Sequence, residues 1–519
     1  MSENAALPDA DVIAALQAQL AALRNELLIV TVERDLLRER IAGFEHKLFA
    51  ARSEARGTAQ RDLFFNEAEG LDQGDAPEEA VNVPAHRRHK RGRKPLDPDW
   101  PREVIRIELP EDQRLCPHDG AALVEIGIEA SEQVDIVPAK VRVIRQERVK
   151  YACPCCRQGM RTAPAPVKLI PKSLLTANAL AWVITAKYQD GLPLYRQSAL
   201  FGPLGGALCR NTLAHNVVRA GIEVQPVINL LRDHLLEAAI LLGDETEVQV
   251  LKEPGRAAQT KSYLWAQMNA AEAATGPPVR LFTYAPSRSA KTALALYAGA
   301  KGALMSDGYE SYAAVARAYG LVHLGCWAHA RRTLVEAEQT VPRAARSPHH
   351  PATQLLALIS ALYAVEARWR EAAPAMQTPD YRLQLRQSDS KPLLARIHAL
   401  LLANLHTVLP GSALGKALHY LAGQWPKLIR FADHGSYPID NNPCENAIRP
   451  FVIGRRNWLF CDSVAGANAS ANLYSLIETA KANCIEPYRY LRTLFDQLPN
   501  AKTAEQIETL LPWNISLLP

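Results

Sequence analysis

Residues 239–244 of this 519-residue chain read AILLGD, and residues 302–307 read GALMSD. Each stretch is an apolar run that ends in an aspartate, which is typical of a buried β-strand leading into a loop. Further strands are expected at 263–268, 279–284 and 320–326, and a helix at 289–297. The order strand, strand, strand, helix, strand, helix, strand predicts a mixed α/β sheet.

The two aspartates that end these runs, Asp244 and Asp307, are the first candidates for chemistry. A single aspartate after a strand usually caps a turn. Two central strands that deliver carboxylates at the same edge of one sheet can instead hold Mg²⁺, which binds hard oxygen ligands together with water and substrate phosphate. We therefore expect Asp244 and Asp307 to be metal ligands.

A third acid, Glu445, lies in the motif DNNPCEN at 440–446. Asn441 or Asn442 can cap a helix there, Pro443 fits its first position, and Glu445 then falls in the first turn. A glutamate in this turn is also favoured by the helix dipole alone.

Other residues near these acids have side chains that could bind a metal. The rival acids are Glu245, Glu247 and Asp440. Strand alternation puts Glu245 on the opposite side from Asp244, which favours Asp244 as the ligand. Cys326 and His329, with His323 upstream, could also form a metal site. We interpret this stretch instead as a strand that leads into a helix beside the active site.

Two cysteine motifs bracket a small module that is rich in β-branched residues. Cys153 and Cys156 have the C-x2-C spacing of a zinc knuckle, whereas Asp119 stands where a second cysteine would pair with Cys116. Zinc accepts carboxylate as well as thiolate, so these four residues can close a tetrahedral site. His118 is the next candidate ligand, and a site whose cysteines merely pack without zinc is the alternative.

The N-terminal segment, residues 9–56, carries a heptad repeat. Its a positions are Ile13, Leu20, Leu27, Arg34, Ile41 and Leu48, and its d positions are Leu16, Leu23, Val30, Leu37 and Phe44. A seam kept at about 3.5 residues per turn for five heptads predicts a coiled coil, here between copies of the chain. The alternative is one amphipathic helix folded onto its own chain.

The charge changes sign after this segment. Residues 57–85 are expected to form an acidic linker, because 66–80 holds six acids and no Lys or Arg. Residues 86–102 form a basic arm whose cations are Arg87, Arg88, Lys90, Arg91, Arg93 and Lys94. Gly92 lets the flanking arginines splay, which suits an AT-rich minor groove. A solvated tail is the alternative.

Residues 171–235 are expected to be helical and to resemble a helix-turn-helix unit, with a glycine turn at 205–206. The second helix would carry four polar residues toward a DNA groove: Arg210, Asn211, Thr212 and His215. A helical hairpin without a role in DNA binding fits the same pattern.

Composition narrows the class of protein. Hydrophobic residues make up 48% and charged residues 22%, which excludes a wholly disordered or collagen-like chain. No apolar run approaches the about 20 residues of a membrane span, and no signal peptide is expected. Nine cysteines are sparse and odd in number, which favours a reducing cytoplasm. The net charge of +5 is weak evidence for nucleic acid, so the position of the charges matters more.

Several motifs carry a resemblance that covers nearly the whole chain. They are LGDET at 242–246, SDGY at 306–309, GCWAHARR at 325–332, DNNPCENAIRP at 440–450, GRRNW at 454–458 and YSLIETAK at 474–481. Together they resemble the insertion sequence 66 family of bacterial transposases, which are of the DDE type. Two departures from the family are Asp119, in place of a knuckle cysteine, and Asn216, where the helix-turn-helix often carries Trp.

The resemblance implies a multidomain α+β protein with an RNase H-like catalytic core and the triad Asp244, Asp307 and Glu445. The implied parts are a zinc-binding-like module at 103–162, a core at 237–334 and 436–490, a helical insertion at 335–435 and a C-terminal tail at 491–519. It also implies binding to DNA at the element's ends and at the target, and accessory proteins from the same element. The expected location is the bacterial cytoplasm, at the nucleoid and not at a membrane.

The chemistry follows from the residue types. Three carboxylates can hold two Mg²⁺ (or Mn²⁺) ions that clamp the attacking and leaving oxygens of a phosphodiester displacement. Water would cut the element's end, and the released 3′-hydroxyl would attack target DNA at the same site. Because two ends must meet, at least a dimer is expected. Four arginines beside the motifs are expected to hold phosphates: Arg331, Arg332, Arg455 and Arg456.

Two other functions stay open at this stage. One is a structure-selective nuclease on the same kind of core, which would not need the coiled coil, the arm and the knuckle together. The other is a DNA-binding regulator without catalysis, which the acidic triad argues against.

Replacing Arg91 and Arg93 with Ala should weaken DNA binding and make it less sensitive to salt. Each lost phosphate contact releases about one counterion fewer, so the slope of log affinity against log salt should become shallower by about 2. Fluorescence anisotropy over a salt series measures both quantities. If affinity and slope stay unchanged, the arm is a solvated tail.

Overall fold

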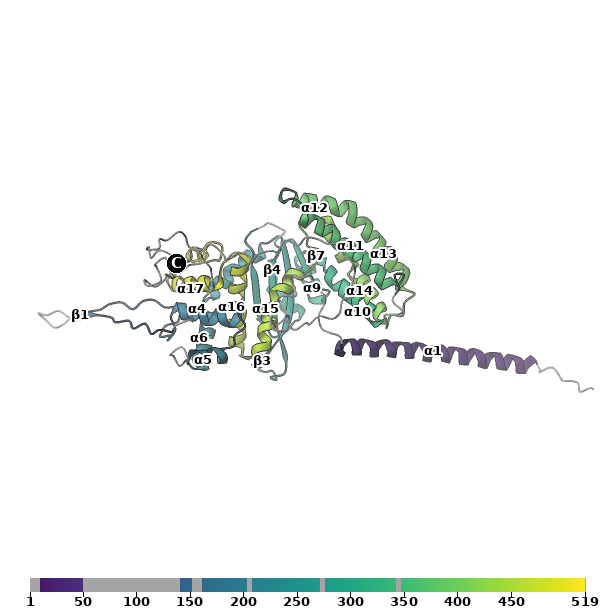
Figure 1. Ribbon diagram of the computed structural model, residues 1–519, viewed down its shortest axis with the longest axis horizontal. Helices are drawn as coiled ribbons and strands as arrows, with labels where there is room; N and C mark the ends of the chain where they lie inside the picture. The colour runs from purple at the N-terminus through teal and green to yellow at the C-terminus, as the bar shows by residue number, and fades with distance from the viewer. Residues whose placement is uncertain are drawn as a thin grey trace, which may run out of the picture. The chain divides into compact units, whose positions relative to one another are not determined.

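The structure is a computed structural model that describes residues 10–49, 141–151, 161–202, 208–270, 276–341 and 347–518. The chain divides into two units, one of Met1–Ala50 with Val141–Pro519 and one of Ala51–Lys140. The second unit lies outside the described residues, and so do the acidic linker and the basic arm. The first unit combines helices with a mixed sheet, which confirms the α+β class (Figure 1).

The five predicted strands form one sheet. Strands β3 (Ile240–Lys252), β4 (Lys261–Asn269) and β5 (Arg280–Ala285) are antiparallel neighbours, whereas β6 (Ala303–Ser306) and β7 (Val322–Gly325) run parallel to β3 on its other side. The order across the sheet is β5-β4-β3-β6-β7. The mixed sheet expected from the apolar runs is therefore confirmed.

Strand β3 is longer than the apolar run that predicted it. The prediction ended at Asp244, but β3 stays paired with β4 as far as Gln249 and then pairs with β8 (Cys461–Ser463). Val248 and Val250 are buried between exposed neighbours. This alternation marks a strand with one solvated face, which a search for continuous apolar runs misses. Asp244 thus lies inside a strand and not at its end.

Helix α16 (Val464–Ala482) covers the outer edge of β5. The hydroxyl oxygens of Ser475 and Thr479 accept hydrogen bonds from the backbone N–H groups of Phe282 at 2.7 Å and Arg280 at 3.1 Å. An open edge would leave these N–H groups free to pair with another chain. Two hydroxyls one helical turn apart therefore close this side of the sheet.

Two tyrosines lie against β3 directly beside Asp244: Tyr297, which follows α8 (Ala290–Leu296), and Tyr312 of α9 (Glu310–Tyr319). A Cβ atom at Gly243 would lie 2.0 Å from the hydroxyl of Tyr297 and 2.9 Å from the ring of Tyr312. Only glycine leaves room for these rings, so the residue before Asp244 is fixed by packing.

The predicted insertion is helical and has a hydrophobic core of its own. Its helices are α10 (Trp327–Thr340), α11 (Pro351–Glu371), α12 (Pro379–Leu385), α13 (Lys391–Leu405) and α14 (Ala413–Leu428). Short 3₁₀ helices lie at Pro374–Met376 and Ile429–Asp433, and a π-helical segment at Arg386–Ser390 joins α12 to α13. Leu355, Ile359, Ile397 and Leu418 are among its buried residues.

A buried ion-pair cluster joins α11 to the turn that leads back to the sheet. The carboxylate of Glu366 lies 2.6 Å from Arg382 and 2.7 Å from Arg386. Arg386 also donates to the carbonyls of Phe431 and His434, both at 2.6 Å. Burial acts to raise the pKa of Glu366, but the two arginines outweigh it and the pKa is lowered. Removing one partner of such a pair typically costs about 3–5 kcal/mol.

The region before the sheet consists of α4 (Ala177–Tyr188), α5 (Leu194–Phe201), α6 (Arg210–Glu223) and α7 (Gln225–Leu236). On α6, Arg210, Asn211 and His215 are exposed and Thr212 is half-buried. The expected glycine turn at 205–206 lies outside the described residues.

Asn216 of α6 is a buried position, at which the resemblance expected a Trp. Its Oδ1 accepts a hydrogen bond from Ser173 at 2.6 Å, and its Nδ2 donates to the carbonyl of Thr212 at 2.8 Å. The buried amide is thus satisfied at both ends.

The remaining elements are short. Strands β1 (Lys150–Tyr151) and β2 (Arg161–Thr162) form an antiparallel pair. Helices α17 (Pro487–Gln497) and α18 (Ala504–Glu508), with a turn at Leu498–Asn500, end the chain, and α17 packs against α4. Among the described helices, none combines the length and apolar character that crossing a bilayer requires.

The N-terminal segment is a single helix, α1 (Ala10–Phe49), in which the heptad seam faces solvent. Seam leucines are exposed by 49% at Leu20 and by 68% at Leu27. The helix contacts its own chain near Glu39, which accepts hydrogen bonds from the hydroxyl of Thr340 at 3.4 Å and from the backbone N–H of Ala413 at 3.0 Å. The exposed seam is nevertheless available to a partner. The pairing itself stays a prediction.

Placing Asp at both Leu20 and Leu27 should dissociate the protein toward monomer. Burying two carboxylates at the centre of the seam costs several kcal/mol, which a coiled coil of this length does not offset. Light scattering measures the mass. The matched control places Asp at Ala18 and Asn25, on the opposite side of the helix, and should keep the parent mass. Equal masses for all three proteins would exclude α1 as the main contact.

Candidate active site

Two neighbouring parallel strands bring Asp244 and Asp307 to one side of the sheet. Leu242 of β3 is paired with Met305 of β6, so the two aspartates follow at matching positions. Asp307 comes directly after β6 and accepts a hydrogen bond from the backbone N–H of Tyr309 at 2.9 Å. Asp244 accepts one from the backbone N–H of Glu245 at 2.9 Å.

Helix α15 (Asn442–Trp458) brings Glu445 to the same place. The fully buried Asn441, just before the helix, donates from its side-chain amide to the carbonyl of Gly243 at 2.9 Å. Its backbone N–H contacts the sulfur of Cys326 at 3.2 Å. One residue therefore fixes the start of α15 against the strand that carries Asp244.

The helix is capped differently from the sequence-based expectation. Asn441 is the N-cap residue, as one of the two alternatives predicted, but its side chain makes no capping hydrogen bond because it is bonded to the sheet. The carboxylate of Asp440 accepts instead from the backbone N–H of Asn442 at 3.1 Å. Asp440 also accepts from the hydroxyl of Tyr363 at 2.8 Å. Its oxygens are thus engaged in holding α15, which argues against Asp440 as the third metal ligand.

Asp244 lies close enough to the other acids for their charges to act on it. Burial raises the pKa of Asp244 to about 8, and Glu245, Asp307 and Glu445 each add to the increase. Oε1 of Glu445 is buried without a hydrogen-bond partner among the described residues. A set of hard oxygen donors with an unsatisfied carboxylate fits a divalent cation, which would neutralise the cluster.

The rival acids on β3 are engaged elsewhere. Glu245 accepts a hydrogen bond from the hydroxyl of Tyr312 at 2.7 Å and lies 3.7 Å from the guanidinium of Arg288. Glu247 is exposed and pairs with Lys261 at 2.7 Å. These contacts support Asp244 as the ligand on this strand.

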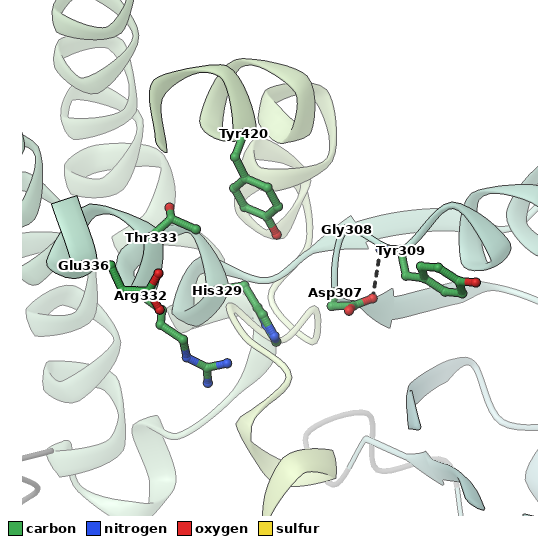
Figure 2. A pocket seen from close by; sticks show the side chains of 8 residues that line it. All are labelled: Asp307, Gly308, Tyr309, His329, Arg332, Thr333, Glu336 and Tyr420. Carbon is green, nitrogen blue, oxygen red and sulfur yellow. Dashed lines mark hydrogen bonds between the residues drawn. The ribbon is translucent and has the colours of Figure 1, made fainter. Parts of the chain in front are cut away.

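A cavity of about 300 Å³ opens beside Asp307, between the sheet and the insertion. Figure 2 shows Tyr420 of α14 pointing toward the space between His329 and Asp307. The residues that line it are Asp307, Gly308, Tyr309, His329, Arg332, Thr333, Glu336 and Tyr420. The insertion thus contributes one wall of the space next to the acids.

The four predicted phosphate-binding arginines lie in two places. Arg332 of α10 pairs with Oε2 of Glu445 at 3.1 Å, and Arg331 beside it is exposed. Arg455 and Arg456 lie in the last turn of α15, where Arg455 is half-buried and Arg456 is exposed. Arg332 is therefore next to the candidate ligand Glu445, and the phosphate contacts stay predictions.

Sequence reasoning missed two residues of this site. Asn441 was considered only as a cap, although an amide at that position can reach a neighbouring strand. His329 was interpreted as structural, yet its Nδ1 lies 3.6 Å from Oε1 of Glu445. The predicted change from strand to helix around it is confirmed, because β7 ends at Gly325 and α10 begins at Trp327.

Several predicted site residues lie outside the described part of the chain. They are the possible zinc ligands Cys116, Asp119, Cys153 and Cys156 and the arm residues Arg87, Arg88, Lys90, Arg91, Arg93 and Lys94. Their roles stay predictions.

Comparison with known families identifies the class of protein. The Transposase IS66 family matches residues 172–469, and the IS66 C-terminal element matches residues 475–513. The zinc-finger binding domain of transposase IS66 matches residues 113–157, which include all four possible zinc ligands. A domain described as Transposase C of IS166 homeodomain matches residues 36–105. The chain belongs to the IS66 family of transposases, a membership that supports a role in DNA transposition.

Three similar proteins come from Sinorhizobium fredii. Uncharacterized protein y4jD is 33% identical over 423 residues, which cover 80% of this chain and 80% of that protein. Uncharacterized protein y4qI is 33% identical over 422 residues, with 79% and 75% covered. Uncharacterized protein y4hP is 28% identical over 514 residues, with 96% and 88% covered. These names state no activity, so the function rests on the family.

Replacing Asp244 with Asn should change how the stability of the metal-free protein depends on pH. The folded-state pKa of about 8 lies above the ordinary 3.8. Below about pH 4, Asp244 is protonated in both the folded and the unfolded protein. As the pH rises toward 8, the unfolded chain releases this proton while the folded protein keeps it, so the folded protein loses stability. Asn does not ionise, so the variant should match the parent near pH 4 and unfold at a higher temperature at pH 8.

Calorimetry in EDTA between pH 4 and 8 measures this difference. Each kcal/mol should move the unfolding midpoint by about 2–4 °C. The control Asp233→Asn, an exposed acid on α7, should follow the parent at every pH. Adding Mn²⁺ at pH 8 should stabilise the parent more than Asp244→Asn. Parallel profiles for Asp244→Asn and the parent would contradict a crowded acidic cluster.

Proposed function

We propose that this transposase cuts and joins DNA at a divalent-metal site formed by Asp244, Asp307 and Glu445. The observation that carries the proposal is the geometry: the register of β3 and β6 gives Asp244 and Asp307 matching positions, and Asn441 bonds the start of the helix that carries Glu445 to Gly243. Burial, together with the neighbouring carboxylates, raises the pKa of Asp244 to about 8. Such an arrangement is costly for folding, which is typical of a functional site.

The sheet supports an RNase H-like core. Three antiparallel strands are followed by two that run parallel to the first, with the order β5-β4-β3-β6-β7. The first acid lies on central strand β3, the second follows its parallel neighbour, and the third lies on a helix after the insertion. We infer the core type from this topology together with the positions of the acids.

Mg²⁺ or Mn²⁺ fits the oxygen donors of the three acids. When bound, the cation supplies activation of the attacking oxygen and neutralises charge on the phosphodiester. The chain's own residues prepare this site. The N–H of Tyr309 orients Asp307, Arg332 orients Glu445, and Asn441 sets the distance between α15 and β3. Fixing each carboxylate in advance lowers the reorganisation that the reaction requires.

The remaining parts of the chain are proposed to bring DNA to this site. The basic arm and the exposed side of α6 would hold the element's ends, and Arg331, Arg455 and Arg456 would contact phosphates. Zinc at Cys116, Asp119, Cys153 and Cys156 would stabilise the module that precedes α4. Pairing through α1 would join two ends, with accessory proteins from the same element as further partners, in the bacterial cytoplasm at the nucleoid.

Asp244→Asn and Glu445→Gln should abolish cleavage of a duplex that carries the element's end. Loss of a direct ligand should reduce the rate by more than the about 10–100-fold that loss of a supporting residue costs. The assay uses purified protein with Mg²⁺ or Mn²⁺ and follows both strand cleavage and joining to a target duplex. End binding, measured on the same duplex, should stay close to that of the parent.

The matched control is Asp233→Asn, which should cleave and join like the parent. Normal cleavage by Asp244→Asn would contradict the assignment of Asp244 to the active site. Cleavage by the parent without any joining, under conditions that keep the 3′-hydroxyl intact, would favour the nuclease instead.

A further inference from the structure

One histidine faces the candidate site beside the three acids. His329 lies in the first turn of α10 and lines the same cavity as Asp307 (Figure 2). Its Nδ1 lies 3.6 Å from Oε1 of Glu445. Both atoms are buried, and neither has a hydrogen-bond partner among the described residues. Two unsatisfied polar atoms thus face each other in a polar site.

The distance between Nδ1 of His329 and Oε1 of Glu445 bears on whether the two atoms share a hydrogen bond or bind one cation. An N–H···O hydrogen bond spans about 2.7–3.2 Å, so 3.6 Å is too long. Two ligand atoms that each lie about 2.1 Å from one cation are about 3.0 Å apart at the right angle of an octahedron and about 3.4 Å apart at a tetrahedral angle. The observed 3.6 Å is close to these values, so a small movement of the imidazole would let one cation bind both atoms.

A third group nearby, Cys326, is engaged in the fold. Ligand atoms of Cys326, His329 and Glu445 lie within 4.8 Å of one another. The Cys326 sulfur accepts a hydrogen bond from the backbone N–H of Asn441 at 3.2 Å. Because this bond fixes the sulfur against the segment that positions α15, the imidazole and the carboxylate are the groups left for a metal.

We propose that His329 is a ligand of the divalent cation at the candidate active site and shares that cation with Glu445. The inference rests on the proposed function and extends it, because the donor set becomes mixed nitrogen and oxygen. Imidazole favours first-row transition ions over Mg²⁺, so the site binds Mn²⁺ more tightly than Mg²⁺. Arg332, bonded to Oε2 of Glu445 at 3.1 Å, leaves Oε1 facing His329.

Pulsed electron paramagnetic resonance of Mn²⁺ bound to the full-length protein tests the assignment without DNA. The parent should show the ¹⁴N modulation of a coordinated imidazole, and labelling its histidines with ¹⁵N should change that signal accordingly. His329→Gln should lose the modulation and lower the Mn²⁺ affinity at least about tenfold, with a smaller effect on Mg²⁺. His406→Gln, an exposed histidine after α13, should retain both properties.

The outcomes separate this inference from the proposed function. In one outcome, Mn²⁺ binds the parent but not Asp244→Asn, and no histidine modulation appears. This result overturns His329 as a ligand and leaves the three-carboxylate site intact. A histidine that only pairs with Glu445 as a cation would give this result. Mn²⁺ binding that is indifferent to Asp244→Asn overturns the proposed function and this inference together. If the parent shows no histidine modulation, the assignment is overturned even when His329→Gln does not fold.

Discussion

The hydrogen bond from the side chain of Asn441 to the carbonyl of Gly243 is the contact on which the site depends. It joins residues 198 positions apart at 2.9 Å and is fully buried. Without it, the mutual repulsion of Asp244, Asp307 and Glu445 would favour moving α15 away from the sheet. This buried hydrogen bond therefore opposes the electrostatic repulsion among the three carboxylates.

The insertion supports this bond from the other side. Trp327, at the start of α10, donates its indole N–H to the carbonyl of Leu428 at 2.8 Å and its backbone N–H to Ile439 at 3.2 Å. Tyr363 of α11 bonds Asp440 at 2.8 Å, directly before Asn441. The helices between β7 and α15 are thus bonded to the segment that positions Glu445. A long insertion can precede α15 without loosening it, because the insertion's own core and these bonds hold the returning chain.

The sheet and the candidate acids could be predicted because apolar runs and helix-start residues are patterns of neighbouring residues in the sequence. Apolar runs ending at Asp244 and Asp307 identified strands β3 and β6, and Pro443 with Glu445 identified the start of α15. The full length of β3, the bond made by Asn441 and the approach of His329 to Glu445 were not predicted. Each of these depends on a partner far away in the chain, which neither periodicity nor capping rules encode. The two stretches that carry the possible zinc ligands and the basic arm lie outside the described residues, so their roles still rest on sequence alone.

The central claim is that three acids, brought together by the sheet and by Asn441, form one metal site. The most direct test is a crystal structure of the protein with Mn²⁺, with anomalous scattering recorded at a wavelength where manganese scatters strongly. We predict an anomalous peak within coordination distance of both Asp244 and Glu445, with Asp307 bound to the same ion or to a second one beside it. A peak elsewhere in the chain, with these three carboxylates bonded only to protein, would contradict the claim.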